Sequence, residues 1–153
     1  MSTGLRRQGR EIALKIIYSL PDQPESIDRV LADFWRHYRF RDDILGEPLE
    51  DPLEPVPEPI RSFAESLVRG VADCLDQLDE LLREHSTNWS LERMSRVDLA
   101  LLRLGAYELL KTPEVPVNVV INEAIEIGKR YGTEETPGFV NGILDKISRL
   151  RQP

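Results

Sequence analysis

The sequence is poor in the residues that build disulfide frameworks and metal sites. Among its 153 residues there are one cysteine, Cys74, and two histidines. A single cysteine cannot form a disulfide within the chain, which favours a reducing compartment, and no cysteine–histidine spacing typical of a metal site occurs. Glycine-rich phosphate loops and the serine nucleophile motif of hydrolases are absent as well. We therefore expect a non-catalytic protein that uses neither a metal nor another cofactor.

Long hydrophobic runs are also missing. No apolar stretch approaches the roughly 18 residues that a membrane-spanning helix requires. Arg6 and Arg7 precede the apolar residues 12–14, as in a secretion signal, but Glu11 and Lys15 interrupt the hydrophobic stretch. These absences predict a cytoplasmic protein that neither enters a membrane nor is secreted.

The charge is unevenly distributed along the chain. The formal net charge is -7, and residues 42–65 alone sum to -7, whereas residues 1–20 sum to +3. Residues 41–59 also contain five of the eleven prolines, which forbid a continuous helix. We interpret 41–59 as an acidic, proline-rich insertion. It is either a tolerated surface loop, since added loop length costs little, or a regulatory or partner-docking segment.

Apolar residues recur at helical spacing elsewhere, and no segment shows the alternation of a strand. The spacing predicts helices over 12–20, 27–35, 60–85, 97–110, 117–131 and 136–150. Ser95 with Asp98 is typical of a helix start, Gly132 of a helix end, and Thr136 before Pro137 of an N-cap and first helical residue. The chain is therefore predicted to be all-α, with an N-terminal half over 1–86 and a C-terminal half over 87–150.

A basic strip begins the first helix. Arg6, Arg7 and Arg10 lie where the helix dipole disfavours cations, and helical spacing returns Tyr18 to the side of Arg7. Arginine binds phosphate, and an aromatic ring stacks on an unpaired base. The strip is therefore a candidate RNA-binding surface, with a solvated charged face as the simpler alternative.

Two single residues further along also stand out. Arg103 interrupts an apolar helix, and Phe139 opens the last helix. From the residues alone, an ion-paired arginine and a core phenylalanine are the simpler interpretations. Two pairs of acids invite a catalytic interpretation, Glu123 with Glu126 and Glu92 with Asp98. Because no nucleophile, metal ligand or histidine base accompanies them, we do not expect catalysis.

Five stretches, taken in order, carry a resemblance to a known family. They are RRQGREIALKIIY at 6–18, NWSLER at 88–93, LRLGAYEL at 102–109, VVINEAIE at 119–126 and FVNGILD at 139–145. Together they look like the bacterial transcription antitermination family NusB. The match covers 6–20 and 88–147 well, 60–85 by helical pattern only, and 21–59 poorly.

The resemblance implies a fold and a set of partners. The expected fold is a single domain of about seven helices, arranged as two three-helix bundles packed crosswise. Proteins of this kind pair with the small-subunit ribosomal protein NusE, and the heterodimer binds the single-stranded boxA element of ribosomal RNA leaders within the RNA polymerase antitermination complex. We expect the same partners here, with a homodimer as a further state of the free protein.

The resemblance also assigns residues. It places RNA contacts at Arg6, Arg7, Arg10, Tyr18, Arg103 and Phe139, and contacts to the ribosomal protein at Tyr18, Glu92 and Asp98. At Gly138 the family usually has a lysine, so one phosphate contact is expected to be missing. Two other functions stay open: a stand-alone relative of the RNA-binding domain of ribosomal RNA cytosine methyltransferases, and a helical adaptor that binds only protein.

Overall fold

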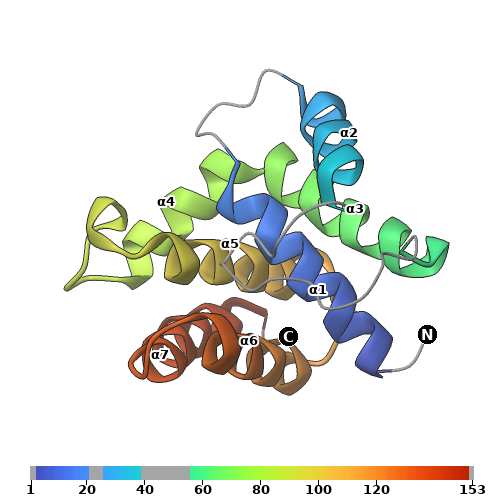
Figure 1. Ribbon diagram of the computed structural model, residues 1–153. Helices are drawn as coiled ribbons and strands as arrows, with labels where there is room; N and C mark the ends of the chain where they lie inside the picture. Colours follow the sequence, from blue (N-terminus) through green and yellow to red (C-terminus); the bar gives the residue numbers. More distant parts are fainter. Residues whose placement is uncertain (1–2, 21–25, 39–55, 152–153) are drawn as a thin grey trace. The chain divides into compact units, whose positions relative to one another are not determined.

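The computed structural model describes residues 3–20, 26–38 and 56–151. Every regular element in these ranges is helical (Figure 1). The elements are α1 (Thr3–Tyr18), α2 (Ile27–Tyr38), α3 (Glu58–Asp73), α4 (Leu75–His85), η1 (Leu91–Arg93), α5 (Arg96–Lys111), α6 (Val117–Tyr131), α7 (Thr136–Ser148) and η2 (Arg149–Arg151). The all-α prediction is confirmed. Residues 41–55 of the expected insertion lie outside the described ranges, and its last two residues, Glu58 and Pro59, instead begin α3.

The chain forms two compact units, Met1–Ala72 and Asp73–Pro153. The boundary lies earlier than the division expected near residue 86, because α4 packs against α5 and α7 of the second unit. The single helix predicted over 60–85 is wrong: Cys74, with φ -123° and ψ 29°, separates α3 from α4. Its apolar stripe nevertheless continues through buried Val71, Leu75 and Leu78, so the spacing alone could not reveal the break.

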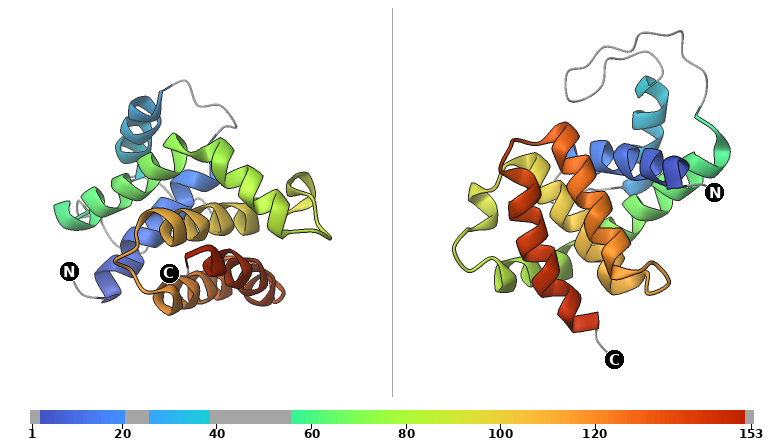
Figure 2. Two further views of the ribbon diagram at one scale, coloured as in Figure 1. Left: turned by 180° about the vertical axis from the view of Figure 1, so that it is seen from behind. Right: turned by 90° about the horizontal axis from the view of Figure 1, so that it is seen from below.

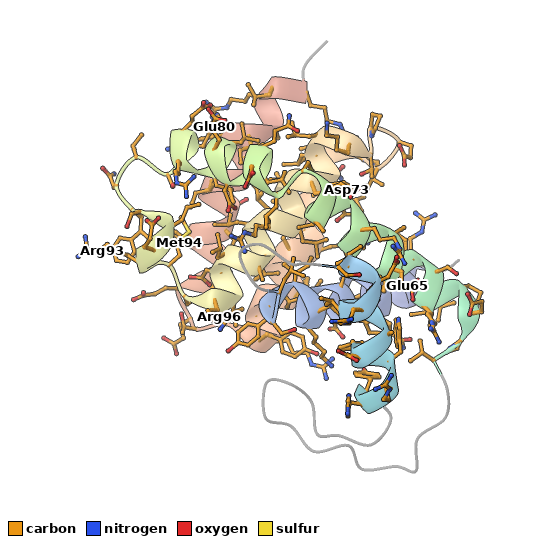
Figure 3. The ribbon with its side chains drawn as sticks, turned by 90° about the horizontal axis from the view of Figure 1, so that it is seen from above. Glu65, Asp73, Glu80, Arg93, Met94 and Arg96 are labelled. Atoms are coloured by element: carbon orange, nitrogen blue, oxygen red, sulfur yellow. The ribbon has the colours of Figure 1, made fainter. Side chains whose placement is uncertain are left out.

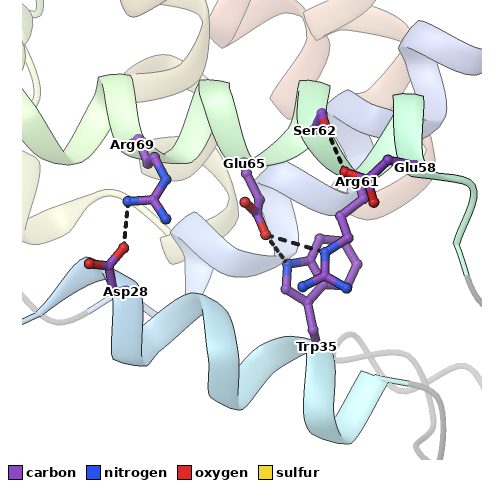
Figure 4. Close-up of polar contacts among 7 residues, drawn as sticks. All are labelled: Asp28, Trp35, Glu58, Arg61, Ser62, Glu65 and Arg69. Atoms are coloured by element: carbon purple, nitrogen blue, oxygen red, sulfur yellow. Dashed lines mark hydrogen bonds and ion pairs between the residues drawn. The ribbon is translucent and has the colours of Figure 1, made fainter.

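In the first unit, α1 and α2 both contact α3. Gly9 of α1 lies against the Phe63 ring, where an added Cβ would come within 2.5 Å of a ring carbon, so the close approach requires glycine. Polar groups fasten α2 to α3: Trp35 Nε1 donates to Glu65 Oε1 at 2.7 Å, and Arg69 pairs with Asp28 at 2.7 Å (Figure 4). The contact of Gly9 with Phe63 places the basic start of α1 against α3, which in turn packs on α2.

The second unit is built around α5. The Ser95 hydroxyl accepts a hydrogen bond from the Asp98 amide at 3.0 Å, which confirms the predicted helix start. Residues 100–106 of α5 are all buried, as expected for a central helix. α6 and α7 lie side by side and run in opposite directions, and both pack on α5 (Figure 1, Figure 2). At Gly105 an added Cβ would come within 2.6 Å of Leu144, so glycine permits this close packing of α5 on α7.

The turn between α6 and α7 sets the position of the last helix. α6 ends at Tyr131 before Gly132, as predicted. Thr136 is the first residue of α7 and not its N-cap, which is Glu135. The buried Thr136 hydroxyl is engaged elsewhere, since it accepts from the Thr133 amide at 3.0 Å and donates to Asp98 Oδ1 at 2.7 Å. This bond ties the start of α7 to the start of α5.

Candidate nucleic-acid interface

The predicted basic strip on α1 is only partly presented to solvent. Arg6 is exposed, Arg7 and Tyr18 are half-buried, and Arg10 is 2% exposed. The Arg10 guanidinium lies 5.5 Å from the centroid of the Phe63 ring, a cation–π arrangement within the unit. Arg6 and Arg7 are therefore the members of the strip best placed to reach a phosphate, whereas Arg10 packs on α3.

Arg103 forms a paired contact inside the second unit. Its Nε and Nη2 donate to the two carboxylate oxygens of Asp79 on α4, each at 2.8 Å, and the Arg103 residue is 8% exposed. A two-point arginine–carboxylate pair of this kind is strong and fixes geometry. In this arrangement Arg103 fastens α5 to α4, and neither of the two grooves described next includes it in its lining.

Two grooves meet at Phe139 in the second unit. The first, of about 410 Å³, is called the Lys146 groove, and it is lined by His85, Ser86, Thr87, Asn88, Trp89, Gly138, Phe139, Gly142, Ile143 and Lys146. The second, of about 390 Å³, is called the Asp98 groove, and it is lined by Trp89, Arg93, Ser95, Asp98, Thr133, Glu135 and Phe139. Only Trp89 and Phe139 belong to both linings. Phe139 is half-buried and thus has surface left for a ligand.

Three side chains at these grooves were not predicted as site residues. Trp89 is 45% exposed, the Arg93 guanidinium lies 5.6 Å from the centroid of its ring, and Lys146 is exposed on α7. Figure 3 shows Arg93 at the outer edge of the segment that joins α4 to α5. The signal available was the NWSLER stretch itself, in which an aromatic and a basic residue lie four positions apart. Their exposure depends on the packing of α4 and α5.

The acids expected to face a protein partner differ in their surroundings. Glu92 is exposed and lies 3.8 Å from Arg83, a loose surface pair. Asp98 is half-buried, accepts the hydrogen bond from Thr136 and lines the groove named after it. The structure therefore brings Asp98 together with Phe139 in one groove, while Glu92 lies outside both linings.

The titratable groups with displaced pKa values do not form a reactive centre. Burial raises the pKa of the Cys74 thiol, with Lys111 working against it, and burial raises the pKa of Tyr107 as well. Both groups are thereby kept protonated near neutral pH, the opposite of an activated nucleophile. Within the described ranges, no group of three or more histidine, cysteine or acidic residues is arranged to hold a metal ion. None of the described helices is long and apolar enough to cross a membrane.

The fold and the grooves of the second unit are those expected of an all-helical protein with a surface suited to single-stranded nucleic acid. The chain is all-α, and its second unit presents aromatic rings beside a lysine and an arginine, the combination that suits single-stranded nucleic acid. The chain belongs to the NusB family, whose model matches residues 7–149.

Individual relatives agree with this assignment. The chain is 64% identical over 153 residues to the transcription antitermination protein NusB of Syntrophotalea carbinolica, covering all of this chain and 97% of the relative. It matches the solved structure of T. maritima NusB with a TM-score of 0.69 and 35% identity, covering 100% of this chain and 96% of that one. A structure of antitermination factors NusB and NusE in complex with dsRNA matches with a TM-score of 0.76 at 19% identity, covering 97% and 99% of the two chains, and this likeness concerns the fold.

Proposed function

We propose that this chain is a non-catalytic transcription antitermination factor that binds boxA-type single-stranded RNA as a heterodimer with the ribosomal protein NusE, within the RNA polymerase antitermination complex. The observation that carries the proposal is the 64% identity over the whole chain to a transcription antitermination protein. The protein acts as a single domain in the cytoplasm. It promotes antitermination by binding its partners and catalyses no reaction.

The proposal divides the predicted RNA residues by what they can reach. Arg6 and Arg7 contact phosphates, and Phe139 stacks on an unpaired base, because these side chains keep exposed surface. Tyr18 is half-buried and offers part of its ring to RNA or to the partner. Arg10 and Arg103 are buried and support the RNA surface indirectly. Arg10 packs on Phe63 of α3, and Arg103 pairs with Asp79 of α4, so each fixes the position of a helix.

In this proposal, Asp98 and Glu92 of the second unit face the ribosomal protein. Ribosomal proteins that bind RNA are basic, and a carboxylate on the Asp98 groove attracts such a partner. Asp98 is also held in place by Thr136, so it meets the partner as a fixed acceptor. Glu92 is free to reorient at the surface because its contact with Arg83 is long and exposed.

Titration of a labelled boxA-type RNA tests the proposal. The protein is added alone and together with the ribosomal protein, at two or more salt concentrations, with a scrambled RNA of equal length as the control. We expect preference for the boxA-type RNA, tighter binding with the partner present, and affinity that falls as salt rises, because bound arginines release counterions from phosphates.

Two outcomes would contradict the proposal. If the ribosomal protein binds but neither RNA is retained, the chain is a protein-only adaptor and the RNA-binding proposal is wrong. If both RNAs bind equally with and without the partner, the affinity is a general attraction between charges and the antitermination role is not supported.

A further inference from the structure

Trp89 is the most exposed aromatic residue in the described part of the chain. It is 45% exposed in the segment that leaves α4, and it borders both grooves. Burying a tryptophan ring stabilises a fold by its large apolar area, and nearly half of the surface of Trp89 is still available for a ligand to cover. The Arg93 guanidinium lies over this ring at 5.6 Å and brings positive charge to an exposed stacking surface.

The Lys146 groove next to Trp89 has room for a planar ligand. Its volume of about 410 Å³ is in the range of small-molecule sites, which begins at about 300 Å³. Two glycines of α7, Gly138 and Gly142, lie one helical turn apart in its lining, and a Cβ added at either would meet no atom within 4 Å. The absence of side chains there leaves the space between α7 and residues 85–89 open.

Charge distinguishes the two grooves. The described lining of the Lys146 groove contains Lys146 and His85 and no carboxylate. The Asp98 groove contains Arg93 but also Asp98 and Glu135. A phosphate is attracted to the first and opposed by two acids in the second, so a nucleic-acid strand that touches both rings is expected to run on the Lys146 side.

We infer that the Lys146 groove holds an unstacked base of single-stranded RNA against Trp89 and Phe139, with Lys146 contacting a neighbouring phosphate. The inference rests on the proposed RNA-binding function and adds to it a second stacking residue and the groove that the base enters. Aromatic stacking of this kind tolerates any base, because every base has a flat face. Trp89 then contributes affinity, while sequence preference comes from exposed polar groups such as those of Thr87 and Asn88 in the same lining.

Affinity measurements with three variants test the role of Trp89. Trp89→Phe keeps a ring, Trp89→Leu keeps an apolar side chain without a ring, and Trp89→Ala removes both. With the boxA-type RNA and the ribosomal protein present, we expect affinity to fall about 5- to 100-fold in the leucine and alanine variants and to be largely kept in the phenylalanine variant. Thermal unfolding of each variant verifies that the substitution leaves the protein folded. Lys146→Gln is expected to reduce the salt dependence of binding by about one phosphate contact.

Tryptophan fluorescence gives a direct readout of stacking. The chain has two tryptophans, Trp35 and Trp89, and Trp35 is on α2 of the first unit with its Nε1 bonded to Glu65. RNA is expected to quench part of the wild-type emission, and this part is absent in Trp89→Phe, whose remaining emission comes from Trp35. Inorganic polyphosphate, which has charge but no bases, is the control and should leave the emission of Trp89 unchanged.

The outcomes separate this inference from the proposed function. If labelled RNA binds in anisotropy but Trp89 emission is unchanged and Trp89→Leu binds as tightly as wild type, the groove does not hold a base, and the proposed function stands. If Trp89→Leu weakens the ribosomal protein and not the RNA, the groove is a protein contact and the inference is wrong. If no RNA binds under any condition, the proposed function and this inference fail together.

Discussion

Arg6 at the start of α1 and Arg103 in the middle of α5 carry the same chemical group in two different surroundings. Arg6 is exposed on the first unit, whereas Arg103 is 8% exposed and gives two hydrogen bonds to Asp79 in the second. Resemblance to the family assigns RNA contact to both. The comparison teaches that a matched position carries over the residue type, while the packing around it decides what the guanidinium can reach.

Arg10 lies between these two cases. It is on the same helix as Arg6, one turn further along, but it is buried with its guanidinium over Phe63. A basic strip defined by helical spacing therefore changes role along its length. Its first residues face outward, and its last one belongs to the packing of α1 on α3.

The largest expected effect is on the buried pair. The side chain of Asp79 is 15% exposed in the pair, and Arg103→Ala leaves this carboxylate without its partner, so we expect the free energy of unfolding to fall by about 3–5 kcal/mol. Urea denaturation followed by circular dichroism measures this. The matched control is Arg149→Ala, which breaks an exposed pair with Asp145 and should cost less than about 1 kcal/mol. An Arg103→Ala protein as stable as wild type but unable to bind RNA would show that Arg103 contacts RNA directly.

The next effect is on the aromatic surface of the second unit. Phe139→Ala removes a half-buried ring that lines both grooves, and we expect RNA affinity to fall by about 1–3 kcal/mol. Phe139→Tyr keeps the ring and should bind nearly as well as wild type. Fluorescence anisotropy of a labelled RNA provides the measurement. Equal affinity of a folded Phe139→Ala protein and the wild type would remove Phe139 from the interface.

A pair of variants on α1 tests the difference between exposed and buried arginines on one helix. Arg6→Ala should leave stability unchanged and reduce the slope of log affinity against log salt by about 0.7, the value for one phosphate of a single strand. Arg10→Ala should lower stability by about 2 kcal/mol through the lost cation–π contact. The reverse pattern, with the salt slope changed only by Arg10→Ala, would contradict the roles that burial assigns to them.

Much of the helical pattern could be predicted because it is local. The capped start of α5 and the end of α6 at Gly132 each depend on a few neighbouring residues. The break at Cys74 could not be predicted, since α3 and α4 both bury the stripe that continues through it. Thr136 before Pro137 predicts an N-cap, but Glu135 has that position and the Thr136 hydroxyl bonds to Asp98, which is 38 residues away in the sequence.

Local sequence patterns also predict only part of the candidate site. Phe139 was predicted from the motif that contains it, and it does lie at a groove. An ion-paired Arg103 is the simpler interpretation of the sequence, and the pair with Asp79 agrees with it; because Asp79 is 24 residues distant, no local pattern identifies it as the partner. Trp89 belongs to the NWSLER stretch that resembles the family, but its exposure depends on where α4 ends and η1 begins. Residue type is local information, whereas accessibility depends on the tertiary structure.

The smallest expected effect concerns Gly138, where the resemblance to the family leads us to expect a lysine. Gly138 is exposed and an added Cβ meets no atom within 4 Å, so Gly138→Lys fits without rearrangement, and its long side chain is expected to place the cation at the solvent edge of the Lys146 groove and not in the space that holds the base. We expect RNA affinity to rise about two- to fivefold, as for one exposed charge contact, and the salt slope to steepen. Gly138→Gln is the control, because it adds similar length and helix propensity without charge. If glutamine tightens RNA binding as much as lysine does, the gain comes from a more stable start of α7, and the missing lysine was not a phosphate contact.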